Sequence, residues 1–469
     1  MLLFCKMNAG SFLFNVFIFS SLNLDALCKS HTFLETEMTQ TKRSVVLSPS
    51  QDVSSVTSPR RRSLLAAGLG AVAVSGFPAI VRAQANKIPV AVVVGLTGRA
   101  SAWGVPVADA VKLCVDQINS SGGIKSKQGA QIELILADHQ SNPQMAGTQT
   151  ERVIQVNNAL VVLGNATSGA TVVGSAAAEK NKTAMLSTDA ADTLTAKGLK
   201  YYFRIGPKAS AMATTAVNFA METAKANGVA PKKVATIADD STFSQDAING
   251  VLRALKGTSW ALQENVSFPA GSVSDFTPIL QRLKLAGVDT IFQATFAPDG
   301  IQILRAMKTL NFDLTAWVHV LGAPYTPEFN AAVKRDGNFI TDAVGFVPEL
   351  ARKNALLNKF SEAYRAKYGK DLDDQSSLGA NSVAVLYDAL ERATSLDREA
   401  IAQAIRSTDL QPGANPFLIR DGVKFDSAGD NTRASGIVMQ LRDEQQRIVY
   451  PASFATEKVV WPMPKWSAR

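Results

Sequence analysis

The chain has 469 residues, a formal charge of +8 at pH 7, 46% hydrophobic residues and three cysteines. This length suits two domains of ordinary size. Removing the first 85 residues leaves 40 basic and 36 acidic residues. Because the remaining charge is small and no basic run is interleaved with aromatics, we expect no nucleic-acid partner.

Residues 58–85 are predicted to be an export signal. Ser58-Pro-Arg-Arg-Arg-Ser-Leu-Leu65 places paired arginines ahead of an apolar segment to Ile80, and Ala83-Gln-Ala85 resembles a cleavage site. The pattern is similar to a twin-arginine signal. We expect cleavage near Ala85 and export to a bacterial periplasm. A transmembrane anchor is the alternative, but the apolar segment has about 17 residues and is broken by glycines and a proline.

Residues 1–57 do not fit a secretory leader, which begins close to its charged region. We expect a wrongly assigned N-terminal extension, with Met38 as a plausible true start. The apolar patch 12–19 is short for a membrane anchor, which is the alternative.

Cys114 is the one cysteine beyond residue 85, so an internal disulfide is not possible there. It lies on the apolar face of a predicted helix, and we expect it to pack in the core. His139 and His319 are 180 residues apart, without cysteines or carboxylates at ligand spacing. The sequence therefore predicts no metal site and no cofactor.

Strands and helices then alternate. The apolar run 88–95 is typical of a strand buried on both faces of a parallel sheet, and apolar residues recur at helical spacing over 104–118. A strand, a helix and a strand follow at 132–136, 143–157 and 159–163. This β-α-β-α-β order indicates a doubly wound sheet.

The same rhythm repeats after residues 201–205. We expect strands at 233–238, 259–268 and 288–293 and helices at 244–255, 276–286, 354–368, 379–393 and 397–406. Segments 423–430 and 436–441 are predicted to be a hairpin or paired strands. The sequence thus predicts an α/β protein of two doubly wound lobes, with ligand contacts from loops at the carboxyl ends of strands.

Reactive motifs are absent from the sequence. It has no Gly-x-Ser-x-Gly elbow, no Gly-x-x-x-x-Gly-Lys phosphate loop and no His-Glu-x-x-His. We therefore expect a protein that is not an enzyme. A hydrolase that uses Asp189 and Asp240 in the same cleft is the alternative, since distant carboxylates can converge.

Several segments resemble, in order and spacing, the leucine/isoleucine/valine-binding-protein family. They are 95–104, 119–124, 137–143, 164–171, 186–189, 203–204 and 425–430. The resemblance implies a type I periplasmic binding protein whose two Rossmann-like lobes are joined by a hinge of three crossovers. Lobe 1 would hold residues 86–208 and 345–445, and lobe 2 would hold 209–344 and 446–469.

The resemblance also places a ligand site. Thr167 and Ser168 follow the strand at 159–163, where backbone N–H groups and hydroxyls can face a carboxylate. Ser168 matches the family's ligand-binding serine, although it could instead be a helix N-cap. Trp103 matches an aromatic wall of the family's cleft. A partly packed surface position is the alternative for this tryptophan.

Other positions match the family less simply. Phe243 and Phe296 lie where the family often has tyrosines, and ordinary core positions are equally expected. Ala191 and Leu321 stand where amino-acid-binding members have a threonine that contacts the ligand and a glutamate that pairs with its ammonium. A buried ammonium needs a partner. Asp189 could be a substitute, or Asp189 and Asp192 could cap the next helix.

The resemblance implies the periplasmic receptor of an ABC importer, partnered by a small-molecule ligand and a membrane permease. Because the ammonium site looks lost, we expect a carboxylate or amide with an apolar or aromatic body, bound by a monomer. The alternatives are an amino-acid receptor that uses Asp189, and a sensory module. Tyr201, His319 and Tyr325 lie near the cleft, but the sequence does not fix their direction.

Overall fold

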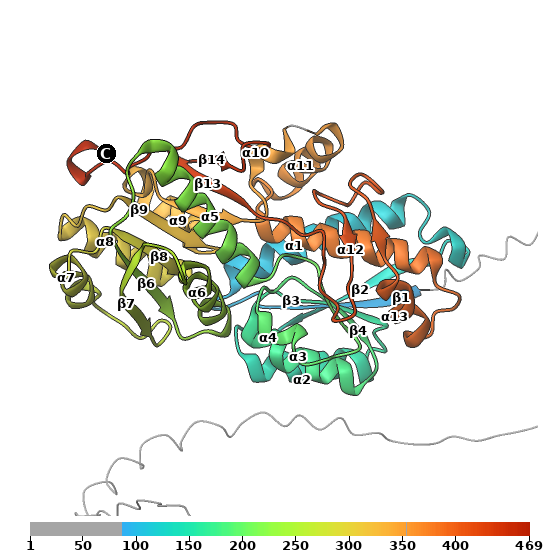
Figure 1. The fold of residues 1–469 in the computed structure, drawn as a ribbon. Coiled ribbons are helices and arrows are strands. Elements are labelled where there is room, and N and C mark those ends of the chain that lie inside the picture. Colours follow the sequence, from blue (N-terminus) through green and yellow to red (C-terminus); the bar gives the residue numbers. More distant parts are fainter. Residues whose placement is uncertain (1–86, 353) are drawn as a thin grey trace, which may run out of the picture. The chain divides into compact units, whose positions relative to one another are not determined.

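The computed structural model describes residues 87–352 and 354–469, and these form two α/β lobes, each built on its own sheet (Figure 1). The predicted fold class is therefore confirmed. The predicted extension, export signal and cleavage site lie outside the described residues.

The first sheet consists, in the described part of the chain, of five parallel strands in the order β2-β1-β3-β4-β5. They are β1 (Lys87–Val94), β2 (Gln131–Asp138), β3 (Val161–Asn165), β4 (Ala184–Ser187) and β5 (Tyr202–Arg204). Helices α1 (Ser101–Ser120) and α12 (Asp374–Arg392) lie side by side on one face, and α2 (Pro143–Gln155) and α3 (Ser168–Lys180) pair on the other (Figure 1). Strands covered on both faces must be apolar at nearly every residue, which explains the run in β1.

The second sheet has the order β14-β13-β10-β9-β8-β6-β7. Its strands are β6 (Lys233–Asp239), β7 (Ala261–Phe268), β8 (Thr290–Ala294), β9 (Ala316–Val320), β10 (Thr341–Val344), β13 (Ile437–Arg442) and β14 (Gln445–Tyr450). The pairs of β13 with β10 and with β14 are antiparallel, and the other pairs are parallel.

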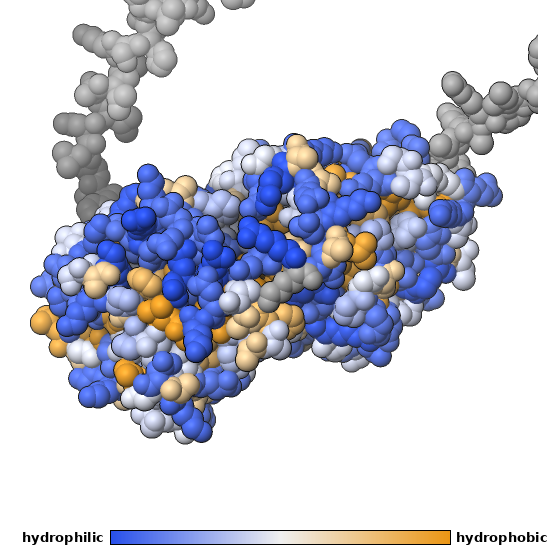
Figure 2. Space-filling model, turned by 90° about the horizontal axis from the view of Figure 1, so that it is seen from above, coloured by the Kyte–Doolittle hydropathy of each residue, from blue (hydrophilic) through white to orange (hydrophobic). Residues whose placement is uncertain are grey.

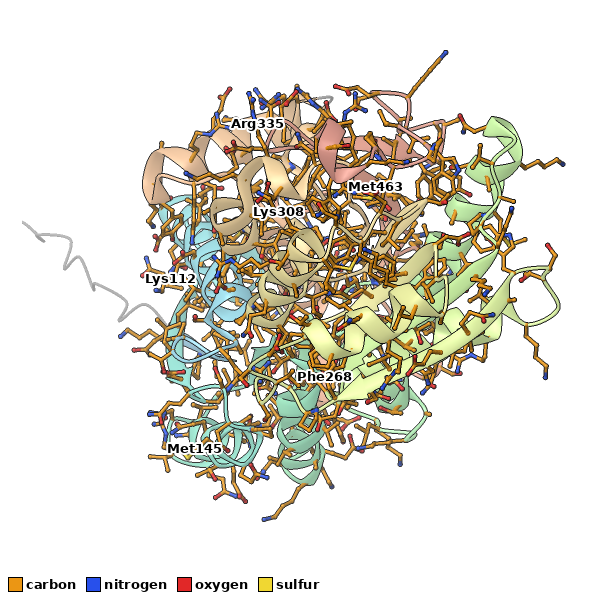
Figure 3. The ribbon with its side chains drawn as sticks, turned by 90° about the vertical axis from the view of Figure 1, so that its left-hand side faces the viewer. Lys112, Met145, Phe268, Lys308, Arg335 and Met463 are labelled. Atoms are coloured by element: carbon orange, nitrogen blue, oxygen red, sulfur yellow. The ribbon has the colours of Figure 1, made fainter. Side chains whose placement is uncertain are left out.

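Separate apolar clusters lie on the two faces of this second sheet. Helices α5 (Ala209–Asn227) and α6 (Thr242–Leu255) supply one cluster, and α7 (Thr277–Leu285), α8 (Ala297–Thr309) and α9 (Pro327–Val333) supply the other. Met145 on α2 and Lys308 on α8 mark the outer helical layers of the two lobes (Figure 3). Shorter or peripheral helices are α4 (Asp192–Thr195), α10 (Pro348–Ala351), α11 (Ala355–Tyr368) and α13 (Arg398–Arg406).

Most predicted elements have observed bounds within a few residues of the expected ones. Helix α12 differs because it begins at Asp374, five residues before the expected start at Gly379. The reason is a capping box: the Asp373 carboxylate accepts from Ser376 N at 2.8 Å, and Asp373 N donates to Ser376 Oγ at 2.7 Å.

The predicted pairing of segments 423–430 and 436–441 is wrong. Strand β12 (Val423–Lys424) pairs with β11 (Asp409–Leu410), whereas β13 pairs with β10 and β14. Residues 437–442 consequently belong to the second sheet, whereas the sequence resemblance places the range 345–445 in lobe 1. Because Ile437 and Met439 face one apolar cluster of that sheet and Val438 faces the other, β13 is buried on both faces, which an exposed hairpin would not require.

The described chain passes between the lobes three times: after β5, after β10 and before β13. The last passage is attached to β5, because Arg204 N donates to Gly429 O at 2.8 Å and the Phe203 and Phe425 rings are 5.2 Å apart. Two segments that the resemblance had matched separately therefore meet in space.

The face of the described residues that Figure 2 shows is mostly hydrophilic, with scattered hydrophobic residues. Within the described ranges, we find no helix that is both long and apolar enough to span a membrane. Cys114 is fully buried, as predicted.

Candidate functional site

A cavity lies between the lobes, at loops that follow the carboxyl ends of strands from both sheets. Its volume is about 520 Å³ when the part open to solvent is included. Such a cavity suits a small molecule. It is lined by Trp103, Ala166, Thr167, Ser168, Thr188, Asp189, Ala190, Gly206, Pro207, Phe243, Phe296, Leu321, Tyr325, Asp374, Gln375 and Leu378.

The structure brings seven of the eight predicted site residues to this cavity. Only Ala191 is not part of the wall: it is fully buried, and its N–H donates to Ser168 Oγ at 3.2 Å and to Asp189 Oδ1 at 3.1 Å. Ala191 thus holds the two loops that carry Ser168 and Asp189 together. Ligand contact by the other seven stays a prediction.

Aromatic side chains from both lobes meet in the cavity. The Trp103 ring is 4.6 Å from the Phe296 ring at 88° and 6.5 Å from the Tyr325 ring at 82°, which are edge-to-face arrangements. Trp103 is 6% exposed, so the surface alternative for it is wrong. Because Trp103 belongs to the first lobe and its two partners to the second, these rings join the walls of the cleft.

A glycine permits the position of Trp103. A Cβ on Gly104 would lie 2.2 Å from Gly95 O, so only glycine lets the first turn of α1 approach the end of β1 this closely. At the same edge of the cleft, Arg99 Nη2 lies 3.4 Å from Asp299 Oδ2, and the guanidinium stacks 4.9 Å from the Phe296 ring centroid. This ion pair is a second link between the lobes.

The N-terminus of α3 forms a polar end of the cavity. The N-cap is Thr167, which makes no side-chain cap bond, and Ser168 is the first helical residue. The N-cap alternative for Ser168 is therefore wrong, and its Oγ instead accepts from Ala191 N. Because the first N–H groups of a helix have no intrahelical acceptor and carry the positive end of its dipole, this end suits a carboxylate.

Asp189 is already paired in the structure. Its Oδ1 lies 3.4 Å from Arg204 Nη1, and its Oδ2 accepts from Ser187 Oγ at 2.6 Å and from Tyr202 OH at 2.7 Å. Burial, and next the charge of Asp189, raises the pKa of Tyr202 well above its usual range. With its charge matched by a buried guanidinium, Asp189 is poorly suited to bind a ligand ammonium.

Neither Asp189 nor Asp192 caps the next helix, α4, because its N-cap is Ala191 and it has no side-chain cap bond. Asp189 accepts from the N–H of Ala191, the N-cap residue of α4. Asp192 Oδ1 accepts from Ser210 N, in the first turn of α5, at 3.0 Å.

Sequence reasoning missed three polar residues of the cavity wall, Thr188, Asp374 and Gln375, and it placed Tyr325 near the cleft without a role. Gln375 Nε2 donates to Tyr325 OH at 3.4 Å. The sequence does contain a hint of the role of Asp374, because two aspartates stand side by side at 373–374. Only one of them is needed to cap the helix, so the other is available for another role.

The other residues considered lie elsewhere. The hydroxyl of Tyr201 donates to Glu399 Oε2 at 2.6 Å, in a different surface groove. His319 is fully buried in β9. Asp240 is not part of the cavity wall and accepts from Ala270 N at 3.0 Å, so the structure does not bring the predicted hydrolase pair together.

Comparisons with known proteins agree with this architecture. A family described as periplasmic binding protein matches residues 87–445. The Leu/Ile/Val-binding protein homolog 7 of Brucella melitensis is 28% identical over 415 residues, which cover 86% of this chain and 99% of that protein.

Two solved structures extend the comparison. A leucine binding protein of Thermotoga maritima is 25% identical, with a TM-score of 0.68 over 77% of this chain and 97% of its own. A solute binding protein of an ABC transporter from R. palustris, in complex with benzoate, is 17% identical, with a TM-score of 0.67. The match covers 80% of this chain and 99% of that protein's chain. The second likeness is one of fold.

Proposed function

Because the chain belongs to the periplasmic binding protein family, we propose that it is the solute receptor of an ABC importer. The resemblance indicated by the sequence segments is confirmed by the family match and by the relatives. In this proposal a ligand bridges the lobes and stabilises the closed form, which then docks on a membrane permease. The receptor would act in the periplasm after cleavage near Ala85.

One observation carries the proposal: a cavity sized for a small molecule lies between two lobes whose aromatic side chains meet across it. A ligand in this position contacts both lobes at once. Its binding energy therefore favours the closed arrangement over an open one.

The ligand we propose is a small organic carboxylate or amide with an apolar or aromatic body. The α3 N-terminus with Thr167 and Ser168 suits the carboxylate, and Trp103, Phe243 and Phe296 supply apolar walls. Leu321 stands where amino-acid-binding members carry a glutamate. The second candidate is a branched-chain amino acid, which is favoured by the names of the Brucella and Thermotoga relatives.

A thermal-shift screen of residues 86–469 tests the proposal. The compounds are amino acids, aromatic and aliphatic carboxylates, amides and small polyols. A ligand at about one hundred times its Kd adds about 2.7 kcal/mol of stability, which raises the Tm by a few degrees. Trp103→Ala should remove the shift, whereas Trp466→Ala, outside the cavity wall, should retain it.

Small-angle scattering then tests closure. The ligand identified in the screen should reduce the radius of gyration of the protein. An unchanged radius with a tightly bound ligand would contradict a bridging role.

A further inference from the structure

Three buried polar atoms of the cavity wall are unpartnered within the described part of the chain. Thr188 Oγ1, Asp374 Oδ1 and Gln375 Oε1 have no hydrogen-bond partner among the described residues, and all three residues line the cavity. They are 3%, 2% and 6% exposed. A buried polar atom without a partner destabilises the folded state, because it has lost its hydrogen bonds to water. A ligand that supplies the missing hydrogen bonds would recover this free energy.

Asp374 is not required to cap its helix. Asp373 already accepts from Ser376 N and closes the capping box of α12. Asp374, the next residue, points a carboxyl group at a neighbour without a side chain: a Cβ on Gly345 would lie 2.7 Å from Asp374 Oδ1. The fold therefore leaves room for this carboxyl group beside the backbone of Gly345 and Phe346, whose hydrogen bonds act to lower the pKa of Asp374, while Oδ1 itself has no hydrogen-bond partner among the described residues.

The charge of Asp374 is also poorly compensated. Among the described residues no lysine or arginine lines the cavity, and the other carboxylate of its wall, Asp189, is matched by Arg204. Arg420 is the cation that acts on Asp374, but its guanidinium is paired with Asp421 at 2.8 Å.

These surroundings make the Asp374 carboxyl group easier to protonate than a free one. Burial, and next the charge of Asp373, raises the pKa of Asp374 to about 7. A hydrogen-bond donor or a positive charge placed in the cavity would satisfy the carboxylate form.

We propose that Asp374 and Gln375 form a donor-recognising end of the cavity, so that the ligand carries a hydroxyl or ammonium group in addition to its carboxylate. The carboxylate is held at the α3 N-terminus, and the donor group is held by Asp374 Oδ1 and Gln375 Oε1. The inference rests on the proposed function and deepens it, because it narrows the ligand class to hydroxy acids and amino acids. It also moves recognition of an ammonium from the position of Leu321 to the start of α12.

Matched acids on two carbon skeletons test this inference by isothermal titration. The first set is phenylpropanoate, phenyllactate and phenylalanine, and the second is isocaproate, its hydroxy acid and leucine. Within one set, we expect the hydroxy acid or the amino acid to bind at least about tenfold more tightly than the acid without a donor, since a hydrogen bond to a charged group contributes about 1.5–3 kcal/mol. The tighter binder of these two, the hydroxy acid or the amino acid, shows whether the donor group of the ligand is a hydroxyl or an ammonium.

Variants locate the effect. Asp374→Asn should remove the preference for the donor-bearing acid, while Asp371→Asn, which changes an exposed aspartate just before α12, should keep it. Gln375→Met provides an independent test should Asp374→Asn fail to fold, which circular dichroism would show.

The two possible failures are distinguishable. If an acid without a donor binds as tightly as its matched partners and the variants change nothing, the inference is wrong and the proposed function stands. If none of the acids binds, the proposed carboxylate receptor is wrong and this inference falls with it.

Discussion

Replacing Arg204 by methionine should destabilise the protein by several kcal/mol. Arg204 is a fully buried residue of β5 whose Nε donates to Asp430 Oδ1 at 2.8 Å and whose Nη1 lies 3.4 Å from Asp189 Oδ1. It therefore connects the loop after β4 with the last crossover between the lobes. Methionine fills a similar volume but leaves both carboxylates without this cation.

The magnitude follows from burial. The side chains of Arg204 and Asp189 are 0% exposed and that of Asp430 is 9% exposed. Removing one partner of a buried ion pair costs about 3–5 kcal/mol, although Lys208 still lies 2.8 Å from Asp430. With an unfolding entropy of about 0.8 kcal/mol/K for a chain of this size, a loss of about 4 kcal/mol lowers the Tm by about 5 °C.

The dependence on pH separates lost charge pairing from lost packing. Burial alone would raise the pKa of Asp430, but the charge of Arg204 and the bond from Lys208 hold it below its usual range. Without Arg204 the Asp430 carboxylate becomes easier to protonate. The stability deficit of Arg204→Met should therefore be smaller at pH 4.5 than at pH 8.

Urea unfolding followed by circular dichroism at both pH values measures these differences. Arg365→Met is the matched control, because Arg365 pairs with Asp371 on the surface, with 53% and 41% of the side chains exposed. An exposed pair contributes about 0–1 kcal/mol. If both variants lost the same stability, or if the deficit of Arg204→Met did not change with pH, the reasoning would be refuted.

Three further predictions concern substitutions of single residues. Because burial raises the pKa of Asp374 from 3.8 to about 7, the folded state retains a proton that the unfolded state loses, and wild-type stability should fall as the pH rises from about 4 to about 7. Asp374→Asn should remove this loss, which is on the order of 4 kcal/mol, in urea titrations at pH 4.5 and 8. Burial lowers the pKa of His319 to about 3, so the unfolded state binds a proton that the folded state does not, and stability is lost as the pH falls below about 6.5. In His319→Leu the free energy of unfolding should therefore fall less between about pH 6.5 and acidic pH than in the wild type. An unchanged acid profile would contradict this assignment. Gly104→Ala would place a Cβ 2.2 Å from Gly95 O. The variant should therefore have a lower Tm, and it should bind the ligand more weakly because Trp103 is displaced. A wild-type Tm together with wild-type affinity would show that α1 can shift without cost.

Local patterns were sufficient for the elements of the two lobes. A strand buried on both faces must be apolar throughout, and a helix that covers a sheet must repeat its apolar residues at helical spacing. These requirements act within ten to twenty residues of chain. For that reason the runs in β1 and β6 and the spacing in α1 predicted the alternation of strands and helices.

The family resemblance went further, because it combined short segments that are not specific alone. It assigned Trp103, Ser168, Phe296 and Leu321 to one ligand site, and the structure brings all four to one cavity. It did not reveal that Asp189 is paired with Arg204, since that pair depends on how β4 and β5 stack.

The sequence by itself therefore determined the α/β class, the order of most elements and the loops that form the cleft. The tertiary structure decided to which sheet β13 belongs. The apolar residues of this strand are compatible with either sheet, and only its pairing with β10 and β14 assigns it to the second one. The tertiary structure also decided the state of each buried carboxylate. Asp189 is matched by a cation distant in sequence, Asp373 caps α12, and Asp374 Oδ1 is left without a partner among the described residues. Partners of this kind are set by the packing of segments far apart in the chain, which local composition and spacing do not encode.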